Sequence, residues 1–98
     1  MYIVESTQEF REWLRSLRDR RAKARIIKRL QRAETGSLGE WRPIAGVASE
    51  MKIDEGAGYR LYFARRQRTI IIMLAGGNKS SQEIDIARAL LATSELEL

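Results

Sequence analysis

Hydrophobic and polar residues alternate along two stretches in the middle of the chain. In residues 59–63, three apolar side chains alternate with Arg60 and Tyr62, and residues 50–54 alternate in the same way around Lys52. Successive side chains of a β-strand point to opposite faces of the sheet. The short glycine-containing segment between the two stretches favours a hairpin turn. We therefore predict two antiparallel strands with one apolar face, and with Lys52, Arg60 and Tyr62 on the opposite face.

Two segments earlier in the chain have the periodicity of amphipathic helices. Apolar residues in 10–17 recur at positions i, i+3, i+4 and i+7, and a second apolar stripe runs through 22–33. Asp19 and Arg20 separate the two helices, and Gly36 ends the second. Because the connection is so short, we expect the helices to form an antiparallel hairpin.

An unusually apolar segment, residues 69–74, predicts a central strand covered on both faces. We expect Gly76 and Gly77 to end this strand and a final helix to follow. Short strands are also expected at residues 2–5 and 41–44. The final helix is expected to pack on the domain through four apolar residues, Ile84, Ala87, Leu90 and Leu91.

These elements follow one another as a strand, two helices, four strands and a helix. The order predicts a single α+β domain over residues 1–98. In this domain an N-terminal strand and a helical hairpin pack on a mostly antiparallel sheet of about four to five strands, with a C-terminal helix.

The composition narrows the function classes. The chain of 98 residues carries 18 Lys and Arg against 13 Asp and Glu, so its formal net charge is +5, which favours an acidic partner such as nucleic acid. It has no cysteine and no histidine, which excludes disulfides, thiolate metal sites and imidazole catalysis. We find no metal-ligand spacing, and we expect no metal and no cofactor. No signal peptide and no apolar run of roughly 20 residues is present, so we expect a cytoplasmic protein without membrane contact.

The basic residues of the strands and turns are candidates for binding phosphate. Lys52 and Arg60 lie on strands joined by a tight hairpin, so two neighbouring cations can hold a phosphodiester and stabilise charge on it. Lys79 precedes a helix N-terminus, where free backbone N–H groups favour an anion. Tyr62 is a candidate for stacking on RNA or hydrogen bonding to it. From charge alone, an ordinary solvated surface explains these residues at least as well. A hairpin tip that can reach phosphates is expected to carry three more candidates, Arg65, Arg66 and Arg68.

Four motifs carry a resemblance that covers almost the whole chain, and the combination of the two at residues 58–63 and 76–82 is specific. The four motifs are Trp41-Arg42-Pro43-Ile44, Gly46-Val47-Ala48-Ser49-Glu50-Met51-Lys52-Ile53, Gly58-Tyr59-Arg60-Leu61-Tyr62-Phe63 and Gly76-Gly77-Asn78-Lys79-Ser80-Ser81-Gln82, with Asp85-Ile86-Ala87 downstream. With these motifs the chain resembles the RelE/HigB/ParE superfamily of bacterial toxins. Within that superfamily it is most similar to the HigB-like "addiction module killer protein" branch.

The resemblance implies the toxin of a type II toxin–antitoxin system. Such a toxin is a metal-independent endoribonuclease that cleaves mRNA at the ribosome, inhibits translation and is silenced by a cognate antitoxin, here one of the HigA-like helix-turn-helix type. Carried over by motif, Arg60 holds the scissile phosphate, and Lys52 and Lys79 occupy further basic positions of the RNA site. The 2′-hydroxyl of RNA would attack the adjacent phosphate, leaving a 2′,3′-cyclic phosphate and a 5′-hydroxyl. A lysine held near other cations loses its proton more readily, so either lysine is a candidate base, while the general acid has no candidate.

Two other functions stay open on the same fold. ParE-like toxins inhibit DNA gyrase and are not nucleases, and a non-catalytic domain that binds RNA or protein is a third reading. The resemblance favours the nuclease, because Arg60 and Lys79 fall where nucleolytic relatives place basic groups.

Overall fold

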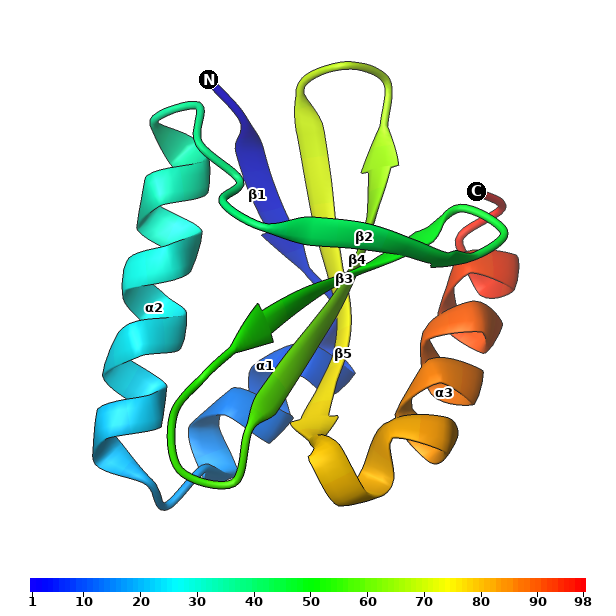
Figure 1. Ribbon diagram of the computed structural model, residues 1–98. Helices are drawn as coiled ribbons and strands as arrows, with labels where there is room; N and C mark the ends of the chain where they lie inside the picture. Colours follow the sequence, from blue (N-terminus) through cyan, green and yellow to red (C-terminus); the bar gives the residue numbers. More distant parts are fainter.

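One five-stranded sheet forms the centre of the molecule, as Figure 1 shows for the computed structural model, which describes all residues from 1 to 98. Its strands are β1 (Ile3–Ser6), β2 (Trp41–Ala45), β3 (Ala48–Ile53), β4 (Tyr59–Arg66) and β5 (Ile70–Asn78). They lie in the order β1-β5-β4-β3-β2, with β1 parallel to β5 and every other pair antiparallel. The predicted α+β class and mostly antiparallel sheet are therefore confirmed.

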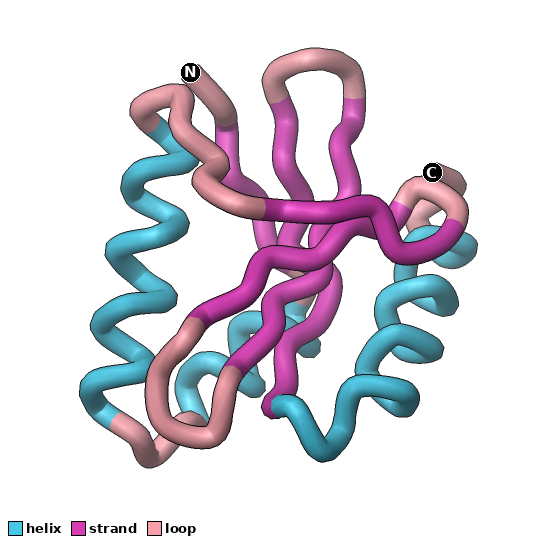
Figure 2. The backbone as a smooth tube through the Cα atoms, in the orientation of Figure 1, coloured by secondary structure: helices cyan, strands magenta, loops and turns pink.

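Helices cover both faces of this sheet. They are α1 (Gln8–Ser16), α2 (Arg20–Glu34) and α3 (Gln82–Glu95), the last preceded by a single 3-10 turn, η1 (Lys79–Ser81). Helix α1 packs against β5 and α2 against β1 and β3, whereas α3 packs against β5 and β4 on the other face (Figures 1 and 2). Each face consequently has its own apolar core, one built around Phe10, Ile26 and Leu61, the other around Leu74 and Ala89. No helix of the chain is both long enough and apolar enough to cross a membrane.

Short polar side chains fix where the first two helices begin. The hydroxyl of Thr7 accepts a hydrogen bond from the backbone N–H of Phe10 at 3.1 Å, and the carboxylate of Asp19 accepts one from that of Ala22 at 3.0 Å. Each bond satisfies a backbone donor that has no partner within its own helix. Asp19, expected only as a break between helices, is therefore the N-cap of α2.

The glycine pair does not end the central strand, as the sequence suggested, because β5 continues through Gly76 and Gly77 to Asn78. The pair instead lets a helix approach the strand closely from each side. A Cβ at Gly76 would lie 2.3 Å from the ring of Trp13 in α1, and one at Gly77 would lie 1.7 Å from Oδ2 of Asp85 in α3. Both helices are thus brought within contact of the sheet at the point where the chain leaves β5.

The predicted packing face of the last helix is right for Leu90, which packs on the second core, and wrong for the other three residues. Ile84 and Leu91 are 60% and 61% exposed, and the residues that α3 buries are Asp85, Ala89 and Thr93. Polar groups can be buried here because each has a partner: Ser81 Oγ donates to Asp85 Oδ2, and Thr93 Oγ1 donates to the carbonyl of Leu90. The polar residues that α3 buries among these apolar ones lie against the sheet face that carries the site described next.

Candidate functional site

A row of residues across three strands brings the predicted cations together. Lys52 of β3 lies directly opposite Arg60 of β4, and Arg60 lies opposite Gly77 of β5. Two residues after Gly77, the chain turns into η1 at Lys79. Lys52, Arg60 and Lys79 consequently line one open pocket of about 280 Å³, which Asp54 and the glycine-containing β3–β4 turn complete.

Arg60 enters this pocket from a largely buried position. The residue is only 8% exposed, because α3 lies over the sheet face that the sequence suggested would present it openly. Its Nη1 donates to Oε1 of Gln82 at 3.1 Å, and its Nε lies 3.6 Å from Oε2 of Glu50. A guanidinium held from two sides has few rotamers left, so its charge occupies a fixed place at the pocket wall.

Glu50 is the centre of a polar network that sequence reasoning missed. This carboxylate is 2% exposed and accepts hydrogen bonds from Nε of Arg42 at 3.0 Å and from Nε2 of Gln82 at 3.2 Å, besides facing Arg60. A signal for it was present, since Glu50 alternates in step with Lys52 and so shares its face of the sheet. Nothing in the sequence showed that α3 would bring Gln82 to the same place.

Tyr62 is not presented to the surface. Its ring is fully buried under α3, and its hydroxyl makes no hydrogen bond. Burial raises the pKa of the phenol well above its usual value, and the nearby carboxylates of Glu50 and Asp85 raise it further. Tyr62 is therefore a neutral core residue in this conformation, and its ring cannot stack on a base.

The three arginines of the β4–β5 hairpin lie away from the pocket. Tyr59 begins β4 beside the pocket and Arg66 ends it, so the eight-residue strand separates the two sites by on the order of 20 Å. Arg65 stacks between two aromatic rings, 5.1 Å from the ring centre of Trp41 and 5.6 Å from that of Tyr2. Of the other two arginines, Arg66 is half-buried and Arg68 is exposed. The structure does not gather the hairpin tip and the pocket into one site.

Metal ligands do not cluster in the molecule: no group of three or more His, Cys, Asp or Glu side chains lies close enough together to hold an ion. The polar chemistry of the pocket is that of one guanidinium, two ammonium groups and the carboxylate of Asp54.

Residues 12–97 match the model of the family described as phage-derived protein Gp49-like (DUF891). The chain belongs to this family. The Gp49-like chain is 39% identical over 95 residues to an uncharacterized protein of Haemophilus influenzae, covering 97% of this chain and 96% of that one. It is also similar to the free Escherichia coli toxin RelE, solved as a double arginine-to-alanine mutant, with a TM-score of 0.71 over 91% of this chain and 94% of that one. The sequence identity to RelE is 16%, so this likeness establishes a RelE-like fold for the Gp49-like chain.

Proposed function

We propose that this chain is the toxin of a type II toxin–antitoxin system and that it cleaves mRNA at the ribosome without a metal ion. The RelE-like fold and the Gp49-like family support a toxin. The observation that carries the nuclease is the pocket, where Lys52, Arg60 and Lys79 converge from two strands and the turn after a third. Three cations around one small opening suit a phosphodiester and the charge that develops on it during cleavage.

In this proposal the guanidinium of Arg60 binds the scissile phosphate. Glu50 and Gln82 restrain Arg60 through Nε and Nη1, which leaves Nη2 for the scissile phosphate. Because the charge is already in place, little reorganisation is needed when negative charge builds up in the transition state. The 2′-hydroxyl attacks the phosphorus, the 5′-oxygen leaves, and a 2′,3′-cyclic phosphate and a 5′-hydroxyl result.

The two lysines are assigned to the proton transfers and to substrate binding. Lys52 and Lys79 are exposed, in contrast to Arg60, so both can approach a bound nucleotide. In this proposal one of the two side chains accepts the proton of the 2′-hydroxyl, and the other supplies a proton to the 5′-oxygen. The ribosome supplies the alignment of mRNA that a chain of this size does not provide.

The remaining predicted contacts fall outside the pocket. Arg65, Arg66 and Arg68 are proposed to bind RNA of the substrate complex at the other end of the sheet, and Tyr62 takes no part while α3 covers it. The protein partner is a cognate antitoxin of the HigA-like helix-turn-helix type, and the compartment is the cytoplasm.

Controlled expression of the chain, with mapping of mRNA 5′ ends, tests this proposal. Lys52→Ala and Lys79→Ala remove exposed groups and are expected to abolish both cleavage and growth arrest while the protein stays folded. Arg60→Ala is expected to do the same, but it also removes a buried ion-pair partner and must be checked for folding. Lys23→Ala is the matched control, because Lys23 lies on α2 and lines none of the pockets described, and it should cleave as the unmodified chain does.

Three results would overturn the assignment. Cleavage that survives both lysine substitutions would remove the pocket from the mechanism. Growth arrest with intact mRNA and damaged DNA would replace the nuclease with a gyrase inhibitor, and no growth effect in the absence of an antitoxin would leave a non-catalytic binding domain.

A further inference from the structure

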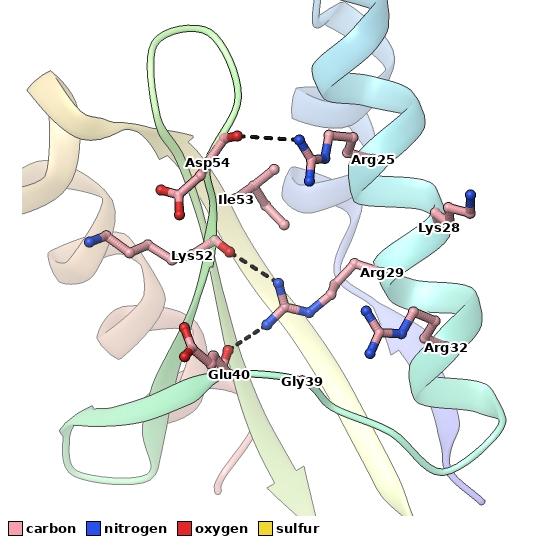
Figure 3. Close-up of a pocket in the computed structure, with 9 residues that line it drawn as sticks. All are labelled: Arg25, Lys28, Arg29, Arg32, Gly39, Glu40, Lys52, Ile53 and Asp54. Atoms are coloured by element: carbon pink, nitrogen blue, oxygen red, sulfur yellow. Dashed lines mark hydrogen bonds between the residues drawn. The ribbon is translucent and has the colours of Figure 1, made fainter.

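A second basic hollow lies between α2 and the exposed end of β3, on the other face of the sheet from α3 (Figure 3). We call it the α2–β3 groove. Its volume is about 550 Å³, nearly twice that of the candidate pocket. It is lined by Arg25, Lys28, Arg29, Arg32, Gly39, Glu40, Lys52, Ile53 and Asp54.

Arg29 forms the floor of the groove and brings a charge that no carboxylate balances directly. Its guanidinium donates to the carbonyl of Leu38 at 3.1 Å. It also donates to the carbonyl of Lys52 at 3.0 Å and to that of Glu40 (Figure 3). Burial lowers the pKa of this guanidinium, and the neighbouring Arg32 lowers it further. Neutral carbonyls satisfy the donors but leave the net charge, so an anion in the groove is favoured.

Two cations on the wall of the groove are free to meet such an anion. Lys28 and Arg32 are exposed, and neither side chain makes a hydrogen bond or an ion pair. They stand four residues apart on α2, where like charges destabilise a helix. An anionic ligand between them would relieve this repulsion. In all, five basic side chains line the groove against the carboxylates of Glu40 and Asp54.

The groove and the candidate pocket are joined at the edge of the sheet. Strand β2 pairs with β3 only as far as Met51, so on that side β3 has no neighbouring strand at Lys52 and Ile53, although β4 still pairs with both residues on the other side. Lys52 and Asp54 line both hollows, and Figure 3 shows the side chain of Lys52 pointing away from α2. A chain of negative charges can therefore pass from the pocket around this edge into the groove over the ammonium group of Lys52.

We propose that an RNA strand held in the pocket continues over Lys52 into the α2–β3 groove, where Lys28 and Arg32 bind its flanking phosphates. The inference rests on the proposed function, since it takes the pocket to be the site of cleavage. An RNA backbone fits better than a peptide, because Ile53 is the only hydrophobic residue lining the groove. Protein partners are held mainly by apolar anchors in desolvated pockets, which this surface does not offer.

Binding of two fluorescent RNAs, a trinucleotide and a dodecanucleotide, tests the path. Both carry 2′-O-methyl groups, so neither can be cleaved. The unmodified chain is expected to bind the longer RNA more tightly, and the Lys28→Ala/Arg32→Ala variant is expected to lose that gain without weaker binding of the trinucleotide. Loss of two phosphate contacts should reduce the salt dependence, the slope of log K against log [salt], by about 1.4.

The charge-matched control is Arg15→Ala/Arg18→Ala. Both residues are exposed and lie outside the groove and the pocket, so the control should bind both RNAs as the unmodified chain does. If both double variants lost the same affinity for the longer RNA, the inference would be overturned, because diffuse attraction between the positive chain and RNA would explain the binding. An acidic peptide that binds through Lys28 and Arg32, with no gain from RNA length, would also overturn it.

Cleavage measured in the same variants separates this inference from the function on which it rests. If the chain cleaved mRNA but bound the longer RNA no more tightly than the trinucleotide, the groove would be rejected as an RNA site and the proposed nuclease activity would be kept. If the chain bound the longer RNA through the groove but cleaved no RNA, the groove would be supported as an RNA site and the proposed nuclease activity would be rejected.

Discussion

Glu50 and Arg60 form an ion pair buried between the sheet and α3, in which Oε2 of Glu50 lies 3.6 Å from Nε of Arg60. The side chains are 2% and 10% exposed. The same carboxylate meets a second arginine, Arg42, whose side chain is 65% exposed. One acidic group thus holds one cation in the interior and another at the surface, and the two pairs differ mainly in their access to water.

That difference predicts unequal costs of substitution. Glu50→Ala strands the Arg60 charge in the interior, and we expect the free energy of unfolding to fall by about 3–5 kcal/mol. Arg42→Ala removes an exposed partner of the same carboxylate and is expected to cost less than about 1 kcal/mol. Urea denaturation of both variants measures the two values. Equal losses would show that Arg60 is not held by Glu50.

Removing the buried hydroxyl of Tyr62 is expected to have the opposite effect, a gain in the free energy of unfolding. Because that oxygen has no hydrogen-bond partner, Tyr62→Phe removes an uncompensated polar group, and we expect stability to rise by about 1 kcal/mol. Tyr62→Ala opens a cavity in the same place and is expected to cost about 3–5 kcal/mol. A clear loss of stability in the Phe variant would mean that the hydroxyl is bonded, with Glu50 as the nearest acceptor to suspect.

Alkaline unfolding tests the raised pKa of Tyr62. In the unfolded chain the phenol ionises near its usual pKa of about 10, but burial keeps it protonated in the folded protein. Above that pH the unfolded state binds fewer protons than the folded state, so stability falls as pH rises, by up to about 1.4 kcal/mol per pH unit from this group. Below about pH 10 the phenol of Tyr62 is protonated in both states, so its contribution to stability is fully present. Tyr62→Phe should lack this part of the decline, which the difference between its pH profile and that of the unmodified chain would show.

The alternation of polar and apolar residues was sufficient to predict strands β3 and β4 and the faces of their residues. It placed Lys52, Arg60 and Tyr62 on one face, as the register of β3 and β4 has them. It did not reveal that α3 covers this face, because the helix was expected to pack through its most apolar residues. Helix α3 instead buries Asp85 and leaves Leu91 exposed. A hydrophobic pattern cannot show a polar helix face whose groups find partners only after folding.

The candidate pocket could be predicted from the sequence only in part. Lys52 and Arg60 could be paired across a hairpin from sequence spacing, and Lys79 could be placed near a helix start. Their convergence depends on β5 running to Asn78, four residues beyond the predicted end at Leu74, which sets η1 beside the row of cations. Gln82 and Glu50 could not be linked from sequence, since they are 32 residues apart and meet only through α3.

The last prediction concerns the two glycines that let the helices approach β5. Gly77→Ala would place a Cβ 1.7 Å from Oδ2 of Asp85, and Gly76→Ala would place one 2.3 Å from the ring of Trp13. Each substitution forces a packed side chain to move, and we expect each to lower the free energy of unfolding by about 1–3 kcal/mol. The two should differ when Asp85→Ala is present.

Removing the carboxylate of Asp85 removes the nearer of two obstacles at Gly77, leaving Ser81 Oγ at 2.7 Å, and it leaves the obstacle at Gly76 untouched. In a double-mutant cycle the cost of Gly77→Ala should therefore shrink in the Asp85→Ala background, whereas the cost of Gly76→Ala should stay the same. Thermal unfolding of the six proteins in the two cycles measures both couplings. If Gly77→Ala cost as much with Asp85→Ala as without it, the close approach of α3 to β5, on which the burial of Arg60 depends, would be wrong.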